Sequence, residues 1–358
     1  MRPATAVIDL GALRHNLRLA RRRAAGAKVV AVVKANGYGH GAARLLEALG
    51  EADMLGVACI EEALALREAG ARQPILLMEG VFEADELPLC ARHGFEVAVH
   101  DATQVEMLER ARLARPLAAW LKVNTGMNRL GVHPEEALGI HGRLRACAAV
   151  APQLRLMTHF ANAEEPGDPA TREQIGRFAA VAGGLTVERS FCNSAGLLLW
   201  PEAHAEWVRP GVMLYGVSPL AGRSGADEGL RPVMTLGTRL IAVREVERGE
   251  AVGYAGTWRA TADTRVGIAA MGYGDGYPRH APSGTPVLVN GKPVALAGRV
   301  SMDMLAIDLT GQPDAQVGDP VALWGDGLPV ETIAARAGTN AYELLCGVTG
   351  RVRVELRG

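Results

Sequence analysis

The chain has 358 residues, of which 49% are hydrophobic and only 4% aromatic, so it can form one large domain and a smaller one with mainly aliphatic cores. Its formal net charge of -1 excludes the basic surface that nucleic acids or anionic membranes require, and no apolar run is long enough to span a bilayer. Five widely spaced cysteines without a Cys-x-x-Cys pair argue against disulfides and structural zinc, and together with the lack of a secretory signal they predict a cytoplasmic protein without a metal site.

The first predicted elements lead to a lysine. Residues 5–9 alternate weakly and predict an edge strand, and the apolar spacing over 10–22 predicts an amphipathic helix. The apolar run 29–33 is typical of a strand buried on both faces of a parallel sheet, and we expect this strand to end at Lys34. A helix is predicted over 41–49, before Gly50.

Lys34 has two interpretations of equal weight. The chain contains four lysines, Lys28, Lys34, Lys122 and Lys292, against a large excess of arginine. A desolvated lysine can lose its proton and form a Schiff base, which arginine cannot, so Lys34 is a candidate for covalent catalysis. The alternative is a lysine at a strand end whose ammonium reaches water.

The pattern of an apolar run followed by a helical segment then repeats. The further predicted strands are 54–59, 74–78, 96–100, 117–124, 154–160, 189–193 and 207–215. Most are separated by predicted helices, at 61–69, 103–113, 135–147 and 172–181. Eight strands alternating with helices over roughly two hundred residues predict an α/β fold of the (β/α)8 TIM-barrel type. A doubly wound open sheet stays the alternative, because spacing alone does not show closure.

The pattern changes after Pro219, where a polar, glycine-containing linker covers 221–228. Strands are predicted at 238–246, 264–271, 286–289, 293–297, 304–309 and 320–324. Asn290-Gly291 between two of them indicates a type I′ hairpin. We therefore predict a barrel at 8–225 and a C-terminal mostly-β domain at 226–358 joined by residues 1–7, and we expect no helix in the second domain.

Polar residues follow several predicted barrel strands. They are Lys34, His100, Lys122 with Asn124, His159, Asn193 with Ser194, and Arg209 with Gly211. A barrel gathers such residues at one mouth, although each alone has an ordinary structural explanation. The loops at 193–196 and 209–212 suit phosphate binding, since barrels often bind phosphate after strands seven and eight. The spacing of Gly37, Gly39 and Gly41 does not fit a dinucleotide fingerprint.

With these motifs in place, the chain resembles the alanine racemase family over nearly its whole length. The resemblance begins with Ala-Val-Val-Lys-Ala-Asn-Gly-Tyr-Gly-His-Gly at 31–41. The further matching motifs, in family order, are 122–131, 158–160, 192–195, 208–211, 214–216, 252–258, 271–276, 298–304 and 341–343.

The resemblance implies an isomerase that interconverts L-alanine and D-alanine for D-alanine biosynthesis with pyridoxal 5'-phosphate (PLP). Lys34 would carry PLP as a Schiff base and act as one base, and Tyr254 would be the other. Arg209 would bond the pyridine nitrogen. Further cofactor-binding residues by this resemblance are Tyr38, His159, Asn193, Ser194, Gly211, Val212 and Tyr342. Arg129 would bind the substrate carboxylate, Met302 and Tyr273 would narrow the substrate approach, and Lys122 would be a carbamylation site. The family commonly has Asp at the position of Asn124.

The resemblance also implies a homodimer with shared sites, because Tyr254, Tyr273 and Met302 lie in the predicted β domain while the cofactor lies in the barrel. Alternatives are a broad-spectrum or serine-preferring racemase and a PLP-carrier protein without enzyme activity. A PLP-dependent decarboxylase lacks its motifs in the second domain, and a barrel that uses lysine on a sugar or keto acid would not explain Arg209 or the tyrosines.

Overall fold

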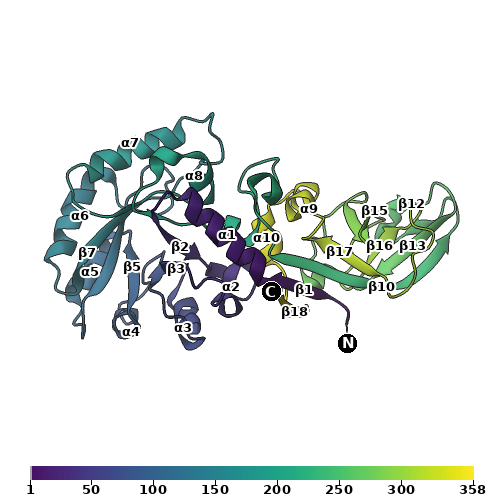
Figure 1. The fold of residues 1–358 in the computed structure, drawn as a ribbon, viewed down its shortest axis with the longest axis horizontal. Coiled ribbons are helices and arrows are strands. Elements are labelled where there is room, and N and C mark those ends of the chain that lie inside the picture. Colours follow the sequence, from purple (N-terminus) through teal and green to yellow (C-terminus); the bar gives the residue numbers. More distant parts are fainter. Residues whose placement is uncertain (1) are drawn as a thin grey trace. The chain divides into compact units, whose positions relative to one another are not determined.

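The computed structural model describes residues 2–358 and divides them into two compact units (Figure 1). The barrel unit comprises 14–214 and 219–222. The β unit comprises the chain up to residue 13, 215–218 and 223–358.

Eight parallel strands form a closed barrel in the barrel unit. They are β2 (Lys28–Val32), β3 (Met54–Val57), β4 (Ile75–Leu77), β5 (Phe95–Val99), β6 (Leu117–Lys122), β7 (Val150–Met157), β8 (Arg189–Ser190) and β9 (Trp207–Val208). Lys28 pairs with Trp207 and Val29 with Val208, and these pairs close the ring between β2 and β9. The predicted TIM-type barrel is confirmed, and the doubly wound alternative was wrong.

Helices alternate with the barrel strands (Figure 1). They are α1 (Leu10–Arg23), which enters from the β unit, α2 (Lys34–Tyr38), α3 (Ile60–Glu68), α4 (Glu86–His93), α5 (Ala102–Arg110), α6 (Pro134–Ala146), α7 (Ala170–Ala182) and α8 (Ser194–Leu199). Short 3₁₀ turns lie at Ala42–Leu45, Pro201–Ala203 and Val212–Tyr215. None of the helices within residues 2–358 has the length and hydrophobicity that a membrane crossing requires.

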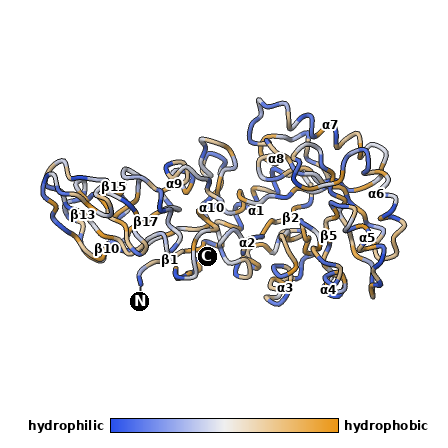
Figure 2. Tube along the Cα trace, turned by 180° about the vertical axis from the view of Figure 1, so that it is seen from behind, coloured by the Kyte–Doolittle hydropathy of each residue, from blue (hydrophilic) through white to orange (hydrophobic). Residues whose placement is uncertain are grey.

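The barrel strands are buried almost throughout. Every residue of β3 and β4 is buried, and β2 is exposed only at its first residue. Parallel strands covered on both faces read as continuous apolar runs, which is why the sequence pattern identified them. Figure 2 shows the same contrast, with hydrophobic stretches along the strands and hydrophilic ones in outer loops.

Three predictions in the barrel unit were wrong in detail. The helix predicted over 41–49 forms only a 3₁₀ turn at Ala42–Leu45 followed by turns. The strands predicted at 189–193 and 207–215 are β8 and β9, of two residues each. In both runs the strand pairing stops before the apolar residues do. After β8, Asn193 already caps α8, and after β9, Pro210 has no amide hydrogen to donate.

The β unit is built on an eight-stranded sheet in the order β13-β16-β15-β14-β17-β10-β1-β18, in which β13 also pairs with β10. Its strands are β1 (Thr5–Asp9), β10 (Met234–Val246), β13 (Thr264–Ala269), β14 (Pro286–Val289), β15 (Lys292–Leu296), β16 (Leu305–Asp308), β17 (Pro320–Trp324) and β18 (Arg353–Arg357). A separate pair consists of β11 (Ala251–Val252) and β12 (Trp258–Arg259). Because of this extra pairing, six strands form a closed ring, in the order β13, β16, β15, β14, β17 and β10.

Two expectations for the β unit were also wrong. Residues 5–9 do not form an edge strand, because β1 lies between β10, antiparallel, and β18, parallel. The unit also contains two helices, α9 (Val330–Ala337) and α10 (Ala341–Cys346). The buried residues of α9, Val330, Ile333, Ala334 and Ala337, have helical spacing, and this was the overlooked signal.

The predicted hairpin between β14 and β15 is confirmed. Val289 pairs with Lys292, and the two residues between them have φ values of 50° at Asn290 and 74° at Gly291. Positive φ at both central residues defines the type I′ turn, whose twist matches that of the flanking strands.

Gly291→Ala tests this turn. A Cβ at this position meets no atom within 4 Å, so its cost is the conformational strain at φ +74° alone. We expect a loss of about 1 kcal/mol in the free energy of unfolding, seen as a lower thermal midpoint by calorimetry. Gly311→Ala is the control, because that glycine also has open space around it but no positive φ. Equal midpoints for the two variants would contradict the turn assignment.

Candidate active site

Lys34 begins a left-handed turn directly after the first barrel strand. The strand β2 ends at Val32, earlier than expected, and Lys34 is the first residue of α2. The φ values that follow are 51° for Ala35, 54° for Asn36, 65° for Gly37 and 51° for Tyr38. A non-glycine residue in this region costs roughly 1–3 kcal/mol, so the surrounding structure must hold the turn in place.

Side chains from neighbouring segments hold this turn. The Glu62 carboxylate accepts the amide of Ala35 at 2.6 Å and that of Ala58 at 2.9 Å. The Asn36 side-chain oxygen accepts the amide of Ala42 at 3.0 Å. Lys34 is thus fixed relative to the ends of β2 and β3.

A small cradle lies after β8 and β9. The Ser194 hydroxyl oxygen accepts the amides of Gly211 at 2.9 Å and Met213 at 3.4 Å. Because the oxygen is the acceptor in both bonds, the hydroxyl proton can be donated to a further group. A Cβ at Gly211 would lie 2.5 Å from the Tyr38 hydroxyl oxygen, so only glycine leaves this space open. The next residue, Val212, is also buried.

Arg209 lies buried behind this cradle, with 2% of its surface exposed. Its guanidinium donates to the Ser190 hydroxyl at 2.5 Å and to the carbonyls of Thr158 and Phe191. Its Nε has no hydrogen-bond partner in the described part of the chain. Burial lowers the pKa of Arg209 to about 10, so it remains protonated at neutral pH.

A cluster of cations shares the barrel mouth with Arg209. Burial and then the charges of Arg209 and Arg129 lower the pKa of Lys122 to about 8. The pKa of His159 lies well below its ordinary value, first because of burial and then because of Arg209, Lys122, Arg129 and Lys34. His159 is therefore neutral at physiological pH. This group of positive charges is suited to an anionic ligand.

Lys122, Arg129, Thr158 and His159 line a narrow crevice that is too small to admit a water molecule. Arg129 lies in the loop between β6 and α6, and Asn124 shapes that loop. The Asn124 side-chain oxygen accepts the amides of Gly126 and Asn128, and its nitrogen donates to the Asn128 side chain at 3.0 Å. An aspartate could make the first two bonds but not the third.

The structure groups the predicted site residues by unit. Those in the barrel unit are Lys34, Tyr38, Lys122, Arg129, His159, Asn193, Ser194, Arg209, Gly211 and Val212. Four others belong to the β unit and are exposed, with exposed fractions of 70% for Tyr254, 38% for Tyr273, 52% for Met302 and 39% for Tyr342. Tyr254 starts a 3₁₀ turn, and a Cβ at the preceding residue, Gly253, would lie 3.7 Å from the Arg299 amide nitrogen.

Sequence reasoning missed three supporting residues, Glu62, Ser190 and Gln174. Gln174 donates to the Thr125 hydroxyl at 3.0 Å and to the His159 carbonyl at 2.9 Å. It is buried on the same face of α7 as Thr171 and Phe178, and a polar residue within such a face was a usable signal. Glu62 and Ser190 gave no comparable signal, because only the fold shows which distant groups they contact.

Comparisons with known proteins agree with this geometry. Residues 8–219 match the model of the alanine racemase N-terminal domain, and residues 233–356 match that of the C-terminal domain. The biosynthetic alanine racemase of Escherichia coli strain K12 is 52% identical over 356 residues, which cover 99% of both chains. The structure of biosynthetic alanine racemase from Pseudomonas aeruginosa matches with a TM-score of 0.97 and 49% identity over 100% of both chains. That of alanine racemase from Acinetobacter baumannii gives 0.95 and 41%, also over 100% of both chains.

The pKa of Lys122 predicts a pH dependence of stability. Between pH 8 and the ordinary value of 10.5, the unfolded chain holds a proton on this lysine that the folded chain has lost. The free energy of unfolding should therefore rise with pH across this window, by about 3 kcal/mol from this group. Urea denaturation in bicarbonate-free buffer should show the rise in the wild type and a smaller one in Lys122→Met. Parallel curves for the two proteins would contradict the lowered pKa.

Proposed function

The chain belongs to the alanine racemase family, and from this membership and the site geometry we propose a PLP-dependent, two-base interconversion of L-alanine and D-alanine. The main support for the proposal is that two features occur together. One is the buried Arg209, whose Nε lacks a partner among the described residues, and the other is the cradle formed by Ser194 and Gly211. The amide of Val32 donates to the Pro210 carbonyl at 3.0 Å, so the strand that leads to Lys34 runs beside this cradle.

The residues present fit PLP. The unpartnered Nε of Arg209 is a donor suited to the pyridine nitrogen. The Ser194 proton and the Val212 backbone suit a phosphate, for which Gly211 leaves room because it has no Cβ. We propose that Lys34 binds the aldehyde carbon of the cofactor. Tyr38, Tyr342, Asn193 and His159 complete the proposed cofactor site. When bound, PLP supplies the electron withdrawal that makes the α-proton of an amino acid removable.

The two proposed bases are Lys34 and Tyr254, which act at the α-carbon of alanine. One removes the α-proton and the other returns a proton from the opposite face, and this inverts the configuration. Arg129 orients the substrate carboxylate, since a guanidinium forms two parallel hydrogen bonds with it. Tyr273 and Met302 restrict the size of the substrate side chain.

We also propose that Lys122 is carbamylated and supports Arg129. Carbamylation requires a neutral amine, and a pKa of about 8 leaves part of the Lys122 population neutral at physiological pH. The modification would replace a positive charge with a negative one in a cluster that holds Arg129, Arg209 and Lys34.

The proposed active form is a homodimer with shared active sites. Tyr254, Tyr273 and Met302 are large side chains that the single chain leaves exposed. In the proposed dimer these residues of one subunit complete the barrel site of the other. We further propose domain bounds of 8–225 and 226–358 with residues 1–7, and a cytoplasmic role in D-alanine biosynthesis, in line with the biosynthetic name of the E. coli relative.

Deuterium exchange tests the two-base proposal. PLP-loaded protein is incubated with L-alanine in deuterated water and should form D-alanine that carries α-deuterium. Proton NMR measures the exchange, and chiral chromatography measures the inversion. Tyr254→Phe should lower racemisation about a hundredfold or more, because it removes one acid/base group, and should retain α-exchange for one enantiomer only.

Tyr277→Phe is the matched control. Tyr277 is buried in the same unit, and its hydroxyl has no hydrogen-bond partner among the described residues. This variant should keep wild-type exchange and inversion. Unchanged racemisation in Tyr254→Phe would refute the role of Tyr254, and neither exchange nor inversion in the wild type would refute the proposed function.

Complementation tests the shared sites. Lys34→Ala and Tyr254→Phe subunits carrying different affinity tags are co-expressed, and the heterodimer is isolated. One of its two sites would then combine an intact Lys34 with an intact Tyr254, so the heterodimer should have about half of the wild-type activity. Both homodimers should be nearly inactive. An inactive heterodimer would show that each site takes both bases from a single chain.

A further inference from the structure

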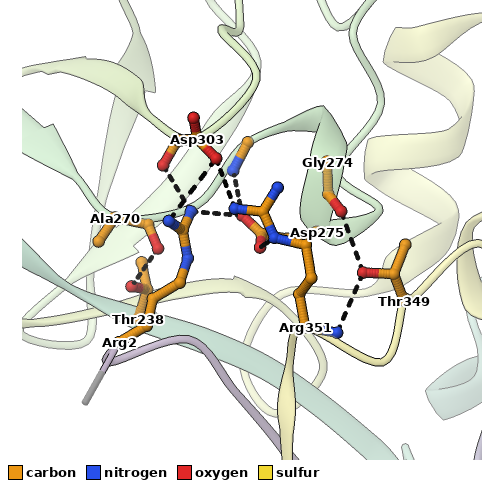
Figure 3. Close-up of polar contacts among 9 residues, drawn as sticks. Arg2, Thr238, Ala270, Gly274, Asp275, Asp303, Thr349 and Arg351 are labelled. Atoms are coloured by element: carbon orange, nitrogen blue, oxygen red, sulfur yellow. Dashed lines mark hydrogen bonds and ion pairs between the residues drawn. The ribbon is translucent and has the colours of Figure 1, made fainter.

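A buried carboxylate lies two residues after Tyr273 in the β unit (Figure 3). The Asp275 side chain is fully buried. Its Oδ2 accepts from Arg2 at 2.6 Å and from the amide of Gly272 at 2.9 Å. Its Oδ1 faces Arg351 Nε at 3.3 Å, an ion pair without hydrogen-bond geometry. Two arginines from opposite ends of the chain therefore neutralise this carboxylate.

The same two arginines bind the segment that carries Met302. Arg351 donates to the Asp303 carboxylate at 2.5 Å, and Arg2 donates to the Asp303 carbonyl at 2.7 Å. The Arg351 bond lowers the pKa of Asp303, so this carboxylate stays ionised at neutral pH. Each arginine thus spans two loops. We call Arg2, Asp275, Asp303 and Arg351 the loop clamp.

Two backbone hydrogen bonds join the two loops. The amide of Tyr273 donates to the Ser301 carbonyl at 3.0 Å, and that of Gly274 donates to the Met302 carbonyl at 2.9 Å. Tyr273 and Met302 are both exposed, so the packing of their own side chains does little to fix their spacing. The loop clamp adds charged contacts between the same two loops to these backbone bonds.

Arg351 also lies directly over the Tyr273 loop. A Cβ at Gly274 would lie 2.3 Å from the Arg351 guanidinium. The Thr349 hydroxyl donates to the Gly274 carbonyl at 3.0 Å, and the Thr349 amide donates to the Asp275 carbonyl at 3.1 Å. The segment before β18 therefore follows the loop closely over 274–275.

We propose that the loop clamp is a positioning network that sets the spacing of Tyr273 and Met302 and thereby limits the side-chain size of the substrate. This inference rests on the proposed function, in which those two residues restrict the substrate approach. With one arginine removed, the loops keep their backbone bonds but lose a charged tie, so they separate more readily and admit a larger side chain.

Arg351→Gln tests the proposal in the full-length protein. Its first readout is amide hydrogen exchange of the ligand-free protein, in which the amides of Tyr273 and Gly274 should exchange about tenfold faster than in the wild type. The second is the ratio of kcat/KM for alanine to that for serine in the PLP-loaded enzyme. That ratio should fall about tenfold, the scale on which a pocket distinguishes one small group.

Two variants serve as controls. Arg353→Gln removes an exposed arginine two residues further along, at the start of β18, whose side chain is ion-paired with Glu355 at 2.5 Å, and it should change neither readout. Arg351→Lys keeps the charge but cannot span two carboxylates with one planar group, so both readouts should be intermediate. If Arg351→Gln fails to fold, Arg2→Gln removes the other tie and carries the same expectation.

The two readouts separate the possible failures. Unchanged exchange at Tyr273 and Gly274 would overturn the loop clamp as a positioning network. Faster exchange with an unchanged alanine-to-serine ratio would overturn its role in specificity. A wild type that does not racemise alanine would refute the proposed function, and the exchange comparison would still decide whether the clamp holds the loops.

Discussion

The site depends on the closure of the barrel between its first and last strands. The pairing of β2 with β9 covers only two residue pairs, and the bond from Val32 to Pro210 extends it. Because of this contact, Lys34 and the Arg209–Gly211 segment, about 175 residues apart in the chain, end at the same mouth. An open sheet with the same strands would leave them at opposite edges.

Closure also creates the electrostatic character of the mouth. Lys34, Lys122, Arg129 and Arg209 come from the ends of three strands, β2, β6 and β9, and each acts on the pKa of His159. Two of these cations, Lys122 and Arg209, are buried, which is unfavourable, and the low pKa of Lys122 is one way in which the protein limits that cost. An anionic cofactor and a substrate carboxylate would offset the remainder, so ligand binding and stability are coupled at this site.

The sequence predicted features that depend on residue type and local spacing. It did not predict features that depend on contacts between residues far apart in the chain. The hairpin at Asn290-Gly291 and the buried barrel strands follow from residue type and spacing, and both were predicted. The alternation of residues 5–9 indicates which face is buried but not how many neighbours a strand has, so β1 was misplaced at an edge. Motifs identified the candidate site residues, whereas the role of Glu62 depends on the turn after Lys34, which no pattern indicated.

The position of β1 between β10 and β18 has a consequence for synthesis. The ribosome releases the first strand of the β unit before the barrel, and β18 only after all the other strands. The barrel residues can therefore fold during translation, while β1 stays unpaired until about two hundred further residues have been synthesised. An exposed strand is open to pairing with other chains in that interval, and the short length of β1, five residues, limits this hazard.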